Sequence, residues 1–490
     1  MTDQTRGAPR GALAEADLLI SRALVGGQWV EGNRAPIAVD DPFTLSTFGE
    51  VPNLGADEAN RAIAAAQEAL PAWAARPAKE RGRILRRWFE LLEQHRDDIA
   101  RLITRENGKT FKEAQGELDY GAGFIEFYAD EATRALGETI PAPVPGRRLY
   151  AEREPVGVCA AITPWNFPLA MLTRKAGPAL AAGCTMVAKP ASMTPLTALA
   201  FAKLGEEAGV PKGVFSVLTG SAREIGGALT GSPVVRKLSF TGSTEIGVQL
   251  YRDCAGTMKR LGLELGGNAP LLIFDDADLG TAVETAMIAK FRNGGQSCIA
   301  ANRIYVQHGI RERFLAAYGE KIGAMRAGDG FEETSDVGPL IDDDAVAKVA
   351  EHRDDALSRG ARCLAGGGSV EGRLFAPTLL ADVPADAQLT REETFGPLAG
   401  VVGFADLEEG VRLANATPFG LAAYLCSEDP ATIARVARQL ECGMVGINTG
   451  LISTPHAPFG GVKMSGVGRE GSHHGIEEYL NIKYVCQAGL

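Results

Sequence analysis

From Val156 onward the chain alternates short apolar runs with stretches of helical periodicity, and this alternation limits the folds that are open to it. The first series contains VGVCAAI at 156–162, CTMVAK at 184–189, a helix at 196–208, GVFSVLTG at 213–220 and VRKLSFTG at 235–242. Strands that alternate with helices form parallel sheets with crossover helices on their faces. The sequence therefore predicts an α/β protein.

A second alternating series follows further along the chain. It begins near Ala269 and ends with the run MVGIN at 444–448. Two α/β domains are therefore expected, joined near residues 260–268. Before the first series, apolar residues at helical spacing predict helices over 56–70 and 79–102.

The charge balance argues against one class of partner. The chain has 61 acidic and 50 basic residues, a formal net charge of −11, and no dense block of Lys or Arg. Nucleic-acid binding depends on neutralising phosphates, so no nucleic-acid partner is expected. The densest basic group alternates with apolar residues, which indicates the solvated face of an amphipathic helix; it consists of Arg81, Arg83, Arg86 and Arg87.

No membrane span, secretion signal or metal centre is expected either. The first 20 residues carry charges of both signs, which does not fit a signal sequence. The longest uncharged run, 155–173, contains Pro155, Pro164 and Pro168 and is interpreted as a buried strand followed by an irregular loop. The eight cysteines are scattered, with no C-x-x-C pair and no Cys/His cluster of metal-binding spacing. Reduced thiols in a cytoplasmic protein are therefore expected.

Two motifs resemble nucleotide-binding loops but lack the required context. A G-x-G-x-x-G pattern occupies 466–471, but the KMS before it is a poor strand end and no βαβ unit surrounds it. This pattern is interpreted as a turn. The segment GKT at 108–110 ends like a P-loop, but Ile103 stands where that motif requires its first glycine. Neither segment predicts a nucleotide site.

Three segments carry residues suited to catalysis. In FRNGGQSC, Cys298 follows two glycines and small polar residues, and a thiolate there is a strong nucleophile if its surroundings lower its pKa. In LELGG, partial desolvation of Glu264 would raise its pKa towards that of a general base. In TPWNFP, prolines fix Asn166, whose amide can donate to an oxyanion. An inert thiol, a solvated carboxylate and a turn amide are the structural alternatives, and a Cys–His hydrolase stays open because catalytic partners can be distant in sequence.

Together these segments resemble the aldehyde dehydrogenase superfamily. The matching motifs are TPWNFP at 163–168, KPA at 189–191, FTGSTEIG at 240–247, ELGG at 264–267, GGQSC at 294–298 and EETFGP at 392–397. They occur in the family's order, and the resemblance covers nearly the whole chain, from about residue 20 to the C-terminus.

The resemblance implies an oxidoreductase mechanism. Cys298 would attack an aldehyde to form a thiohemiacetal, while Asn166 and the Cys298 N–H hold the oxyanion. Hydride would leave to a nicotinamide, and Glu264 would activate the water that hydrolyses the resulting thioester.

The resemblance also implies a Rossmann-like cofactor site that lacks the usual glycine fingerprint. Its residues would be Trp165, Lys189, Ser192, Gly220, Gly242, Ser243, Glu393 and Phe395. The start of a helix at Ser243 suits an anionic pyrophosphate. Relatives that prefer NAD often carry Glu at the position of Ser192, where a carboxylate repels a 2′-phosphate. Serine removes that repulsion and leaves Lys189 as a counter-charge, so NADP with tolerance of NAD is expected, unless Ser192 merely starts the following helix.

Three further segments are similar to the succinate-semialdehyde dehydrogenase branch: LTRKAGPAL at 172–180, FRN at 291–293 and NTGLIS at 448–453. In that branch two arginines and a serine bind the substrate's distal carboxylate, and here they would be Arg174, Arg292 and Ser453. A carboxylate in an apolar tunnel needs such charge-assisted donors. Many members also have a second cysteine two residues after the nucleophile; Ala300 stands there, so disulfide inactivation is not expected.

The expected function is the oxidation of succinate semialdehyde to succinate during 4-aminobutyrate breakdown. Glutarate semialdehyde, or another ω-carboxy-semialdehyde, is the alternative substrate, because one methylene changes binding by only about 1–3 kcal/mol. A non-catalytic binding protein on the same fold is a remote alternative. The joint presence of Cys298, Glu264 and Asn166 argues against it.

The architecture implied by the resemblance is two Rossmann-like parallel-sheet domains and a small β bridging arm. The cofactor domain would comprise 1–128 and 148–262, the catalytic domain 263–465, and the arm 129–147 with 466–490. The C-terminal stretch GIEEYLNIKYVCQAGL shows β-like alternation, as a strand of the arm would. The arm would add a strand to a neighbouring subunit's sheet and give a homodimer or homotetramer.

Overall fold

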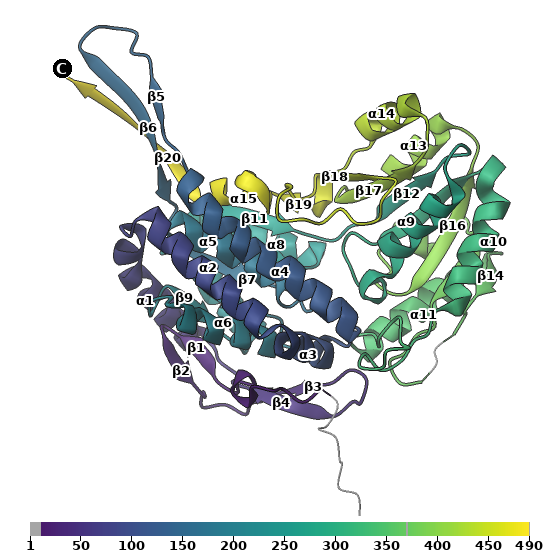
Figure 1. The fold of residues 1–490 in the computed structure, drawn as a ribbon, viewed down its shortest axis with the longest axis horizontal. Helices are drawn as coiled ribbons and strands as arrows, with labels where there is room; N and C mark the ends of the chain where they lie inside the picture. Colours follow the sequence, from purple (N-terminus) through teal and green to yellow (C-terminus); the bar gives the residue numbers. More distant parts are fainter. Residues whose placement is uncertain (1–10, 369–370, 490) are drawn as a thin grey trace, which may run out of the picture.

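Two mixed β-sheets with helices on their faces form the body of the protein, as shown by a computed structural model that describes residues 11–368 and 371–489. In Figure 1 the first sheet and its helices lie on the left, the second sheet lies on the right, and a narrow arm projects from the top left. The predicted α/β class with two sheet domains and a β arm is confirmed.

The first sheet has eight strands, and its five central strands are parallel. The order is β19 (Gly466–Val467), β11 (Arg260–Glu264), β10 (Val235–Thr241), β7 (Val158–Ile162), β8 (Thr185–Lys189), β9 (Phe215–Val217), β1 (Ala23–Val25) and β2 (Gln28–Val30). Every residue of β8 is buried, as expected of a strand covered on both faces. Separate apolar cores fill the two faces of this sheet.

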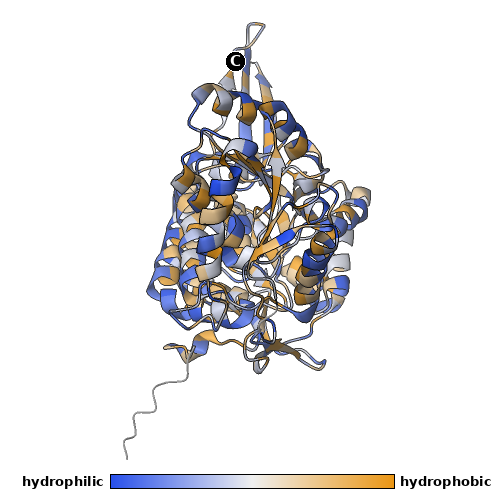
Figure 2. Cartoon of the chain, turned by 90° about the vertical axis from the view of Figure 1, so that its right-hand side faces the viewer, coloured by the Kyte–Doolittle hydropathy of each residue, from blue (hydrophilic) through white to orange (hydrophobic). Residues whose placement is uncertain are grey.

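Helices cover both faces of this first sheet. They are α1 (Ala56–Ala74), α2 (Ala78–Gln94), α3 (Arg96–Asn107), α4 (Phe111–Glu131), α5 (Ala170–Ala182), α6 (Leu196–Ala208), α7 (Ala222–Gly231), α8 (Thr244–Cys254) and the short α15 (Ser472–Glu477). A separate hairpin pairs β3 (Ile37–Asp40) with β4 (Thr47–Val51). Figure 2, which views the molecule from the side of the second sheet, shows hydrophilic and hydrophobic residues mixed along the helices, as in amphipathic helices.

The second sheet has seven strands, all parallel to their neighbours except at the β14 edge. The order is β14 (Arg362–Ala365), β15 (Thr378–Ala381), β16 (Leu398–Phe404), β13 (Ala301–Gln307), β12 (Ala269–Ile273), β17 (Ala422–Cys426) and β18 (Met444–Ile447). Its helices are α9 (Leu279–Phe291), α10 (His308–Ala324), α11 (Asp343–Ser358), α12 (Gln388–Arg391), α13 (Leu407–Asn415) and α14 (Pro430–Gln439). Again a core lies on each face.

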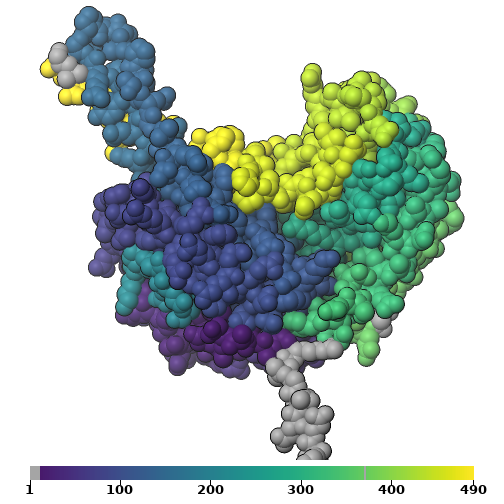
Figure 3. Space-filling view, in the orientation of Figure 1, coloured from purple at the N-terminus to yellow at the C-terminus, as the bar shows by residue number. Residues whose placement is uncertain are grey.

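The arm is a three-stranded sheet of β20 (Leu480–Ala488), β6 (Arg147–Pro155) and β5 (Glu138–Ile140). The strands β20 and β6 pair antiparallel along their whole length. Figure 3 shows the arm standing clear of the body. The structure differs from the expected limits of the arm: α4 runs on to Glu131, β6 extends the arm to residue 155, and β19 and α15 lie with the first sheet and its helices. The domain limits otherwise stay a prediction.

Three local predictions were wrong. The helix expected over 79–102 is two helices, because the backbone at His95 leaves the helical region (φ −101°, ψ 24°) and a new helix starts with two acidic residues that suit its N-terminus. The loop expected to fill the end of 155–173 gives way to α5 at Ala170. Arg81 is not on a solvated face: it is 9% exposed and donates to the carbonyls of Ala181 and Arg76.

Within residues 11–368 and 371–489, no helix is long and apolar enough to cross a membrane. The same residues contain no group of three or more His, Cys, Asp or Glu side chains that could hold a metal ion.

Candidate active site

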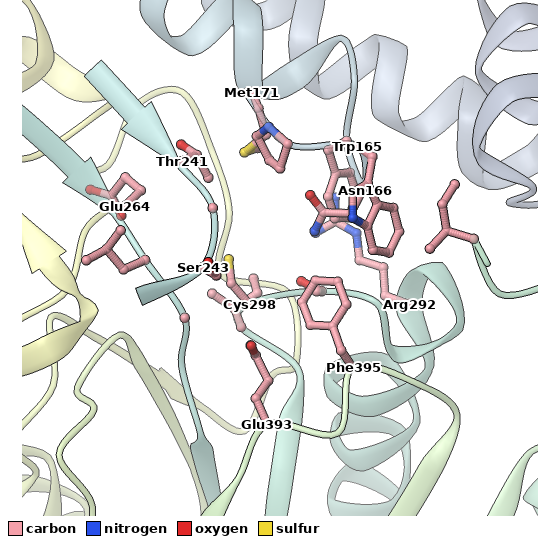
Figure 4. Close-up of a pocket in the computed structure, with 18 of the residues that line it drawn as sticks. Trp165, Asn166, Met171, Thr241, Ser243, Glu264, Arg292, Cys298, Glu393 and Phe395 are labelled. Carbon is pink, nitrogen blue, oxygen red and sulfur yellow. The ribbon is translucent and has the colours of Figure 1, made fainter. Parts of the chain in front are cut away.

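A cavity of about 300 Å³ lies at the carboxyl ends of the parallel strands of the first sheet, facing the second sheet domain. Asn166 follows β7, Ser243 follows β10, and Glu264 ends β11. From the second sheet domain come Cys298 and Glu393. Because the carboxyl ends of parallel strands share one edge, segments far apart in sequence meet there. Figure 4 shows Cys298 between Glu264 on one side and Asn166 on the other.

All but three of the predicted site residues line this cavity. Those that do are Cys298, Glu264, Asn166, Trp165, Gly242, Ser243, Glu393, Phe395, Arg174, Arg292 and Ser453. The exceptions are Lys189, which ends β8, and Ser192 and Gly220, which follow β8 and β9. They therefore extend the same sheet edge away from the cavity.

The loop before Cys298 has a tightly turned backbone. Asn293, Gly294 and Gly295 all have positive φ, at 54°, 60° and 75°. A side chain at Gly295 would meet the carbonyl oxygen of Gly396 at 2.3 Å, so only glycine fits. The loop thereby packs against the segment that carries Glu393.

The surroundings of Cys298 do not lower its pKa. Burial raises the pKa of the thiol to about 12, and the nearby Glu393 charge adds to this, while Arg174 opposes it. The condition set for an activated thiol, surroundings that lower its pKa, is therefore not met in the protein without ligands. A base or a cationic ligand must favour the thiolate during the reaction.

Glu264 has the environment of a general base. Its side chain is buried, and Oε2 has no hydrogen-bond partner. Burial raises the pKa of Glu264 well above its usual value, the Glu470 charge raises it further, and Arg174 and Lys175 oppose both. A desolvated carboxylate without a fixed partner can accept a proton from water.

A buried ionic cluster near Glu264 consists of Glu470, Lys175 and Arg174, and the sequence did not predict it. Glu470 Oε1 accepts a hydrogen bond from Lys175 Nζ at 2.6 Å, and Lys175 Nζ also donates to Thr241 Oγ1 at 2.6 Å. Burial opposes ionisation of Glu470, but Lys175 and Arg174 lower its pKa to about 2. Glu470 therefore stays a carboxylate, which in turn disfavours a second negative charge on Glu264.

The oxyanion candidate Asn166 is held from both sides. It is 6% exposed, and its Nδ2 donates to Gln296 O at 3.0 Å. The Asn166 carbonyl accepts from Asn293 Nδ2 at 2.9 Å. One amide hydrogen of Nδ2 is thus engaged, which leaves the second free to donate to an oxyanion.

Two guanidinium groups give the cavity its positive charge. Arg174 is 1% exposed, lies 3.9 Å from the Phe459 ring centroid, and forms an ion pair with Glu470 at 2.6 Å. That contact lacks hydrogen-bond alignment, so Arg174 Nε and Nη2 stay without an aligned acceptor. Arg292 has no acidic partner among the described residues and lies over Phe167 and Tyr120. Arg292, and the nitrogens of Arg174 that lack an aligned acceptor, can donate charge-assisted hydrogen bonds to an anionic ligand.

Tyr120 was missed by the sequence analysis and completes this end of the cavity. It lies on α4, far in sequence from the catalytic motifs. Its hydroxyl is buried close to Ser453, yet has no hydrogen bond of normal geometry. An unused donor beside Arg174, Arg292 and Ser453 fits a carboxylate. No local motif marks Tyr120, although its helical spacing from Glu113 and Glu117 would have predicted a shared face.

The predicted cofactor residues fit a dinucleotide. Lys189 Nζ lies 3.3 Å from Ser192 Oγ, so a phosphate there could meet both side chains, and burial lowers the pKa of Lys189 to about 8. Ser192 does not start a helix, since α6 begins at Leu196 without a side-chain cap. Ser243 caps α8, whose first N–H groups face the cavity edge.

Glu393 and Phe395 are the two predicted cofactor residues that the second sheet domain contributes to the cavity. Burial raises the pKa of Glu393 to about 7, opposed by a hydrogen bond from Gly267 N. Phe395 stands edge-on to Trp165, with ring centroids 5.5 Å apart. The carboxylate oxygens of Glu393 could accept hydrogen bonds from the hydroxyls of a ribose.

The chain is similar in sequence to proteins of known family. A model of the aldehyde dehydrogenase family matches residues 29–485. The glutarate-semialdehyde dehydrogenase of Pseudomonas putida is 56% identical over 475 residues, which cover 97% of this chain and 99% of that protein. The NADP(+) succinate-semialdehyde dehydrogenase GabD of Escherichia coli is 55% identical over 477 residues, which cover 97% and 99%.

A solved structure agrees with the fold over its full length. The crystal structure of an aldehyde dehydrogenase from Brucella melitensis biovar abortus superposes with a TM-score of 0.97 at 53% identity. The match covers 97% of this chain and 99% of that one.

Proposed function

Since this chain belongs to the aldehyde dehydrogenase family, we propose that it oxidises succinate semialdehyde to succinate, with NADP as the preferred oxidant. The enzyme class predicted from the motifs is confirmed, and semialdehyde oxidation is common to the named relatives. The observation that carries the finer proposal is the pair of guanidinium groups, Arg174 and Arg292, in the cavity that also contains Cys298.

The cavity residues divide the reaction into two halves. In the first, the Cys298 thiolate attacks the aldehyde carbon, and the Asn166 amide with the Cys298 N–H holds the oxyanion. A bound nicotinamide would supply the hydride acceptor, so that the C–H bond could break as the carbonyl re-forms and the thiohemiacetal on Cys298 would become a thioester. In the second half, Glu264 takes a proton from water and the resulting hydroxide attacks the thioester carbon. The C–S bond then breaks, the acid product leaves, and the proton held by Glu264 returns to regenerate the Cys298 thiol.

The distal carboxylate would bind at the other group of residues. Arg174 and Arg292 supply charge-assisted donors, and Ser453 and Tyr120 supply hydroxyls. Glutarate semialdehyde is the second candidate substrate, since the Pseudomonas putida relative is named for it. A pocket distinguishes the two by about 1–3 kcal/mol at most, because they differ by one methylene.

We also propose a homodimer or homotetramer held by the arm. Ile482 and Tyr484 on β20 are 63% and 58% exposed, and β18 is an open edge of the second sheet. An arm strand of one subunit could pair with that edge in another. Sedimentation of the full chain measures the assembly, and a monomer at micromolar concentration would contradict it.

A four-way assay tests the substrate and the cofactor together. Each semialdehyde is offered with NADP and with NAD, and the absorbance of the reduced nicotinamide is followed. We expect the highest kcat/KM with succinate semialdehyde and NADP, because Lys189 and Ser192 could both donate hydrogen bonds to a 2′-phosphate. A higher kcat/KM with glutarate semialdehyde would transfer the proposal to that substrate. A strong NAD preference would contradict the argument from Ser192.

Arg292→Leu tests the anion site. We expect kcat/KM for succinate semialdehyde to fall about 100-fold, near 2.7 kcal/mol, because the carboxylate loses a charge-assisted partner. Tyr120→Phe removes one neutral donor and should cost about 5-fold. Butanal is the matched control substrate, since it has the same chain length and no carboxylate. Equal losses with butanal would mean that Arg292 shapes the cavity rather than binding an anion.

A further inference from the structure

The P-loop-like segment GKT at 108–110 has a different place in the structure. Gly108 ends α3 in the left-handed region, at φ 92°. Thr110 caps α4 by accepting a hydrogen bond from Glu113 N at 3.3 Å. Between them, Lys109 is 2% exposed and turns into the protein. No part of this segment is left to hold a phosphate.

The buried amine of Lys109 contacts one loop and one helix. Its Nζ donates to Glu117 Oε2 at 2.6 Å and to Asn166 O at 2.8 Å, and it lies 4.0 Å from the Phe167 ring centroid. Both charged side chains of the pair are fully buried. The cation is thus bound directly to the backbone of the residue proposed to hold the oxyanion.

The other carboxylate oxygen of Glu117 binds the turn that follows Asn166. Oε1 accepts from Leu169 N at 2.9 Å and from Ala170 N at 3.3 Å. These are the first N–H groups of α5, which has no side-chain cap of its own. One ion pair therefore fixes the stretch from Asn166 to Ala170 at both ends.

The same face of α4 also holds the nucleophile loop. Glu113, one helical turn before Glu117, accepts from Asn293 N at 2.6 Å. Asn293 in turn donates from Nδ2 to the Asn166 carbonyl, the acceptor that Lys109 uses. Tyr120, three residues after Glu117, faces the cavity. Positions three and four apart share one helix face, so α4 supports both catalytic loops and the anion site.

We infer that Lys109 and Glu117 are positioning residues for Asn166, whose carbonyl and following turn they fix so that its side-chain amide meets the oxyanion. The inference rests on the proposed role of Asn166. Buried ion pairs add little net stability compared with apolar side chains of equal size, so stability alone gives no reason for this pair. Each of its hydrogen bonds beyond the ion pair itself ends on the Asn166 loop or on the turn that follows it.

A double-mutant cycle with Asn166 tests the inference. The variants are Lys109→Met, Asn166→Ala and both together, in the full chain, and the readout is the stopped-flow burst of reduced cofactor, which reports hydride transfer. We expect Lys109→Met to slow the burst about 10- to 50-fold and Asn166→Ala about 100-fold or more. The double variant should be within about threefold of Asn166→Ala, because Lys109 acts only through Asn166. KM for the aldehyde should stay within about twofold of wild type.

Controls separate positioning from folding. If Lys109→Met does not fold, the variant Lys109→Met/Glu117→Gln, which removes both charges of the pair, takes its place in the double-mutant cycle with Asn166→Ala. Lys237→Met removes another buried lysine, paired with Glu478 at 3.0 Å, and should leave the burst unchanged. A normal burst in Lys109→Met beside a slow Asn166→Ala overturns the inference alone. The inference is also overturned if the fold-losses in burst rate of the two single variants multiply in the double variant, because the two residues would then act independently. A normal burst in Asn166→Ala overturns the proposed oxyanion role instead.

Discussion

Cys298→Ala is expected to abolish aldehyde oxidation, with turnover at least about 10⁴-fold below wild type, or about 5.5 kcal/mol in activation free energy. An aldehyde cannot release hydride until its carbon becomes tetrahedral, and the thiol is the group in the cavity best able to add to it. The measurement is the rate of reduced nicotinamide formation at saturating succinate semialdehyde and NADP.

The control for this loss is a second cysteine. Cys442 is also half-buried, lies outside the cavity, and donates from its thiol to the Met444 carbonyl. Cys442→Ala should keep wild-type turnover. The rise in melting temperature that NADP causes should be preserved in Cys298→Ala, which shows an intact cofactor site. Turnover above about one per cent in Cys298→Ala would mean that another group is the nucleophile.

The strands could be predicted because their local signals agree with their final environment. The segments of β7 and β8 are short, mostly apolar runs closed by small or turn-forming residues, and nearly all of their residues are buried. The helix α5 could not be predicted in this way. All of its residues are buried, so it shows no amphipathic period, and Pro178 lies inside it. Helix α4 contains several glycines, which weaken the helical signal.

The site residues likewise fall into those that local sequence predicts and those that only the fold brings together. The catalytic candidates lie in short motifs, which the sequence alone can display. The groups that set their electrostatics come from elsewhere: Lys175 and Glu470 form their ion pair across 295 positions of the chain. Arg81 shows the same limit, since an apparently solvated arginine is buried and donates to the carbonyl of Ala181 on α5, which no local pattern reveals. The raised pKa of Cys298 also depends on burial, which the glycine-rich loop does not disclose.

Glu264→Gln is expected to separate the two halves of the reaction. An amide cannot take a proton from water, so thioester hydrolysis should slow about 10²- to 10³-fold, while thioester formation continues. A stopped-flow trace should show a burst of about one reduced nicotinamide per site, followed by the slow steady state. If the burst disappears as well, Glu264 also deprotonates the Cys298 thiol, whose pKa of about 12 requires some base.

The pH profile gives the same experiment a second readout. Burial holds the pKa of Glu264 well above its usual value, and only the carboxylate can act as a base. Steady-state turnover of the wild type should therefore fall as the pH falls through that raised pKa, whereas Glu264→Gln should lack this limb. Glu106 is the matched control: it is buried outside the cavity with a pKa raised to about 8 by burial, and it accepts from the first N–H groups of α6. Glu106→Gln should keep both the limb and the ratio of burst to steady state, because a buried carboxylate slows hydrolysis only where it can reach the thioester's water.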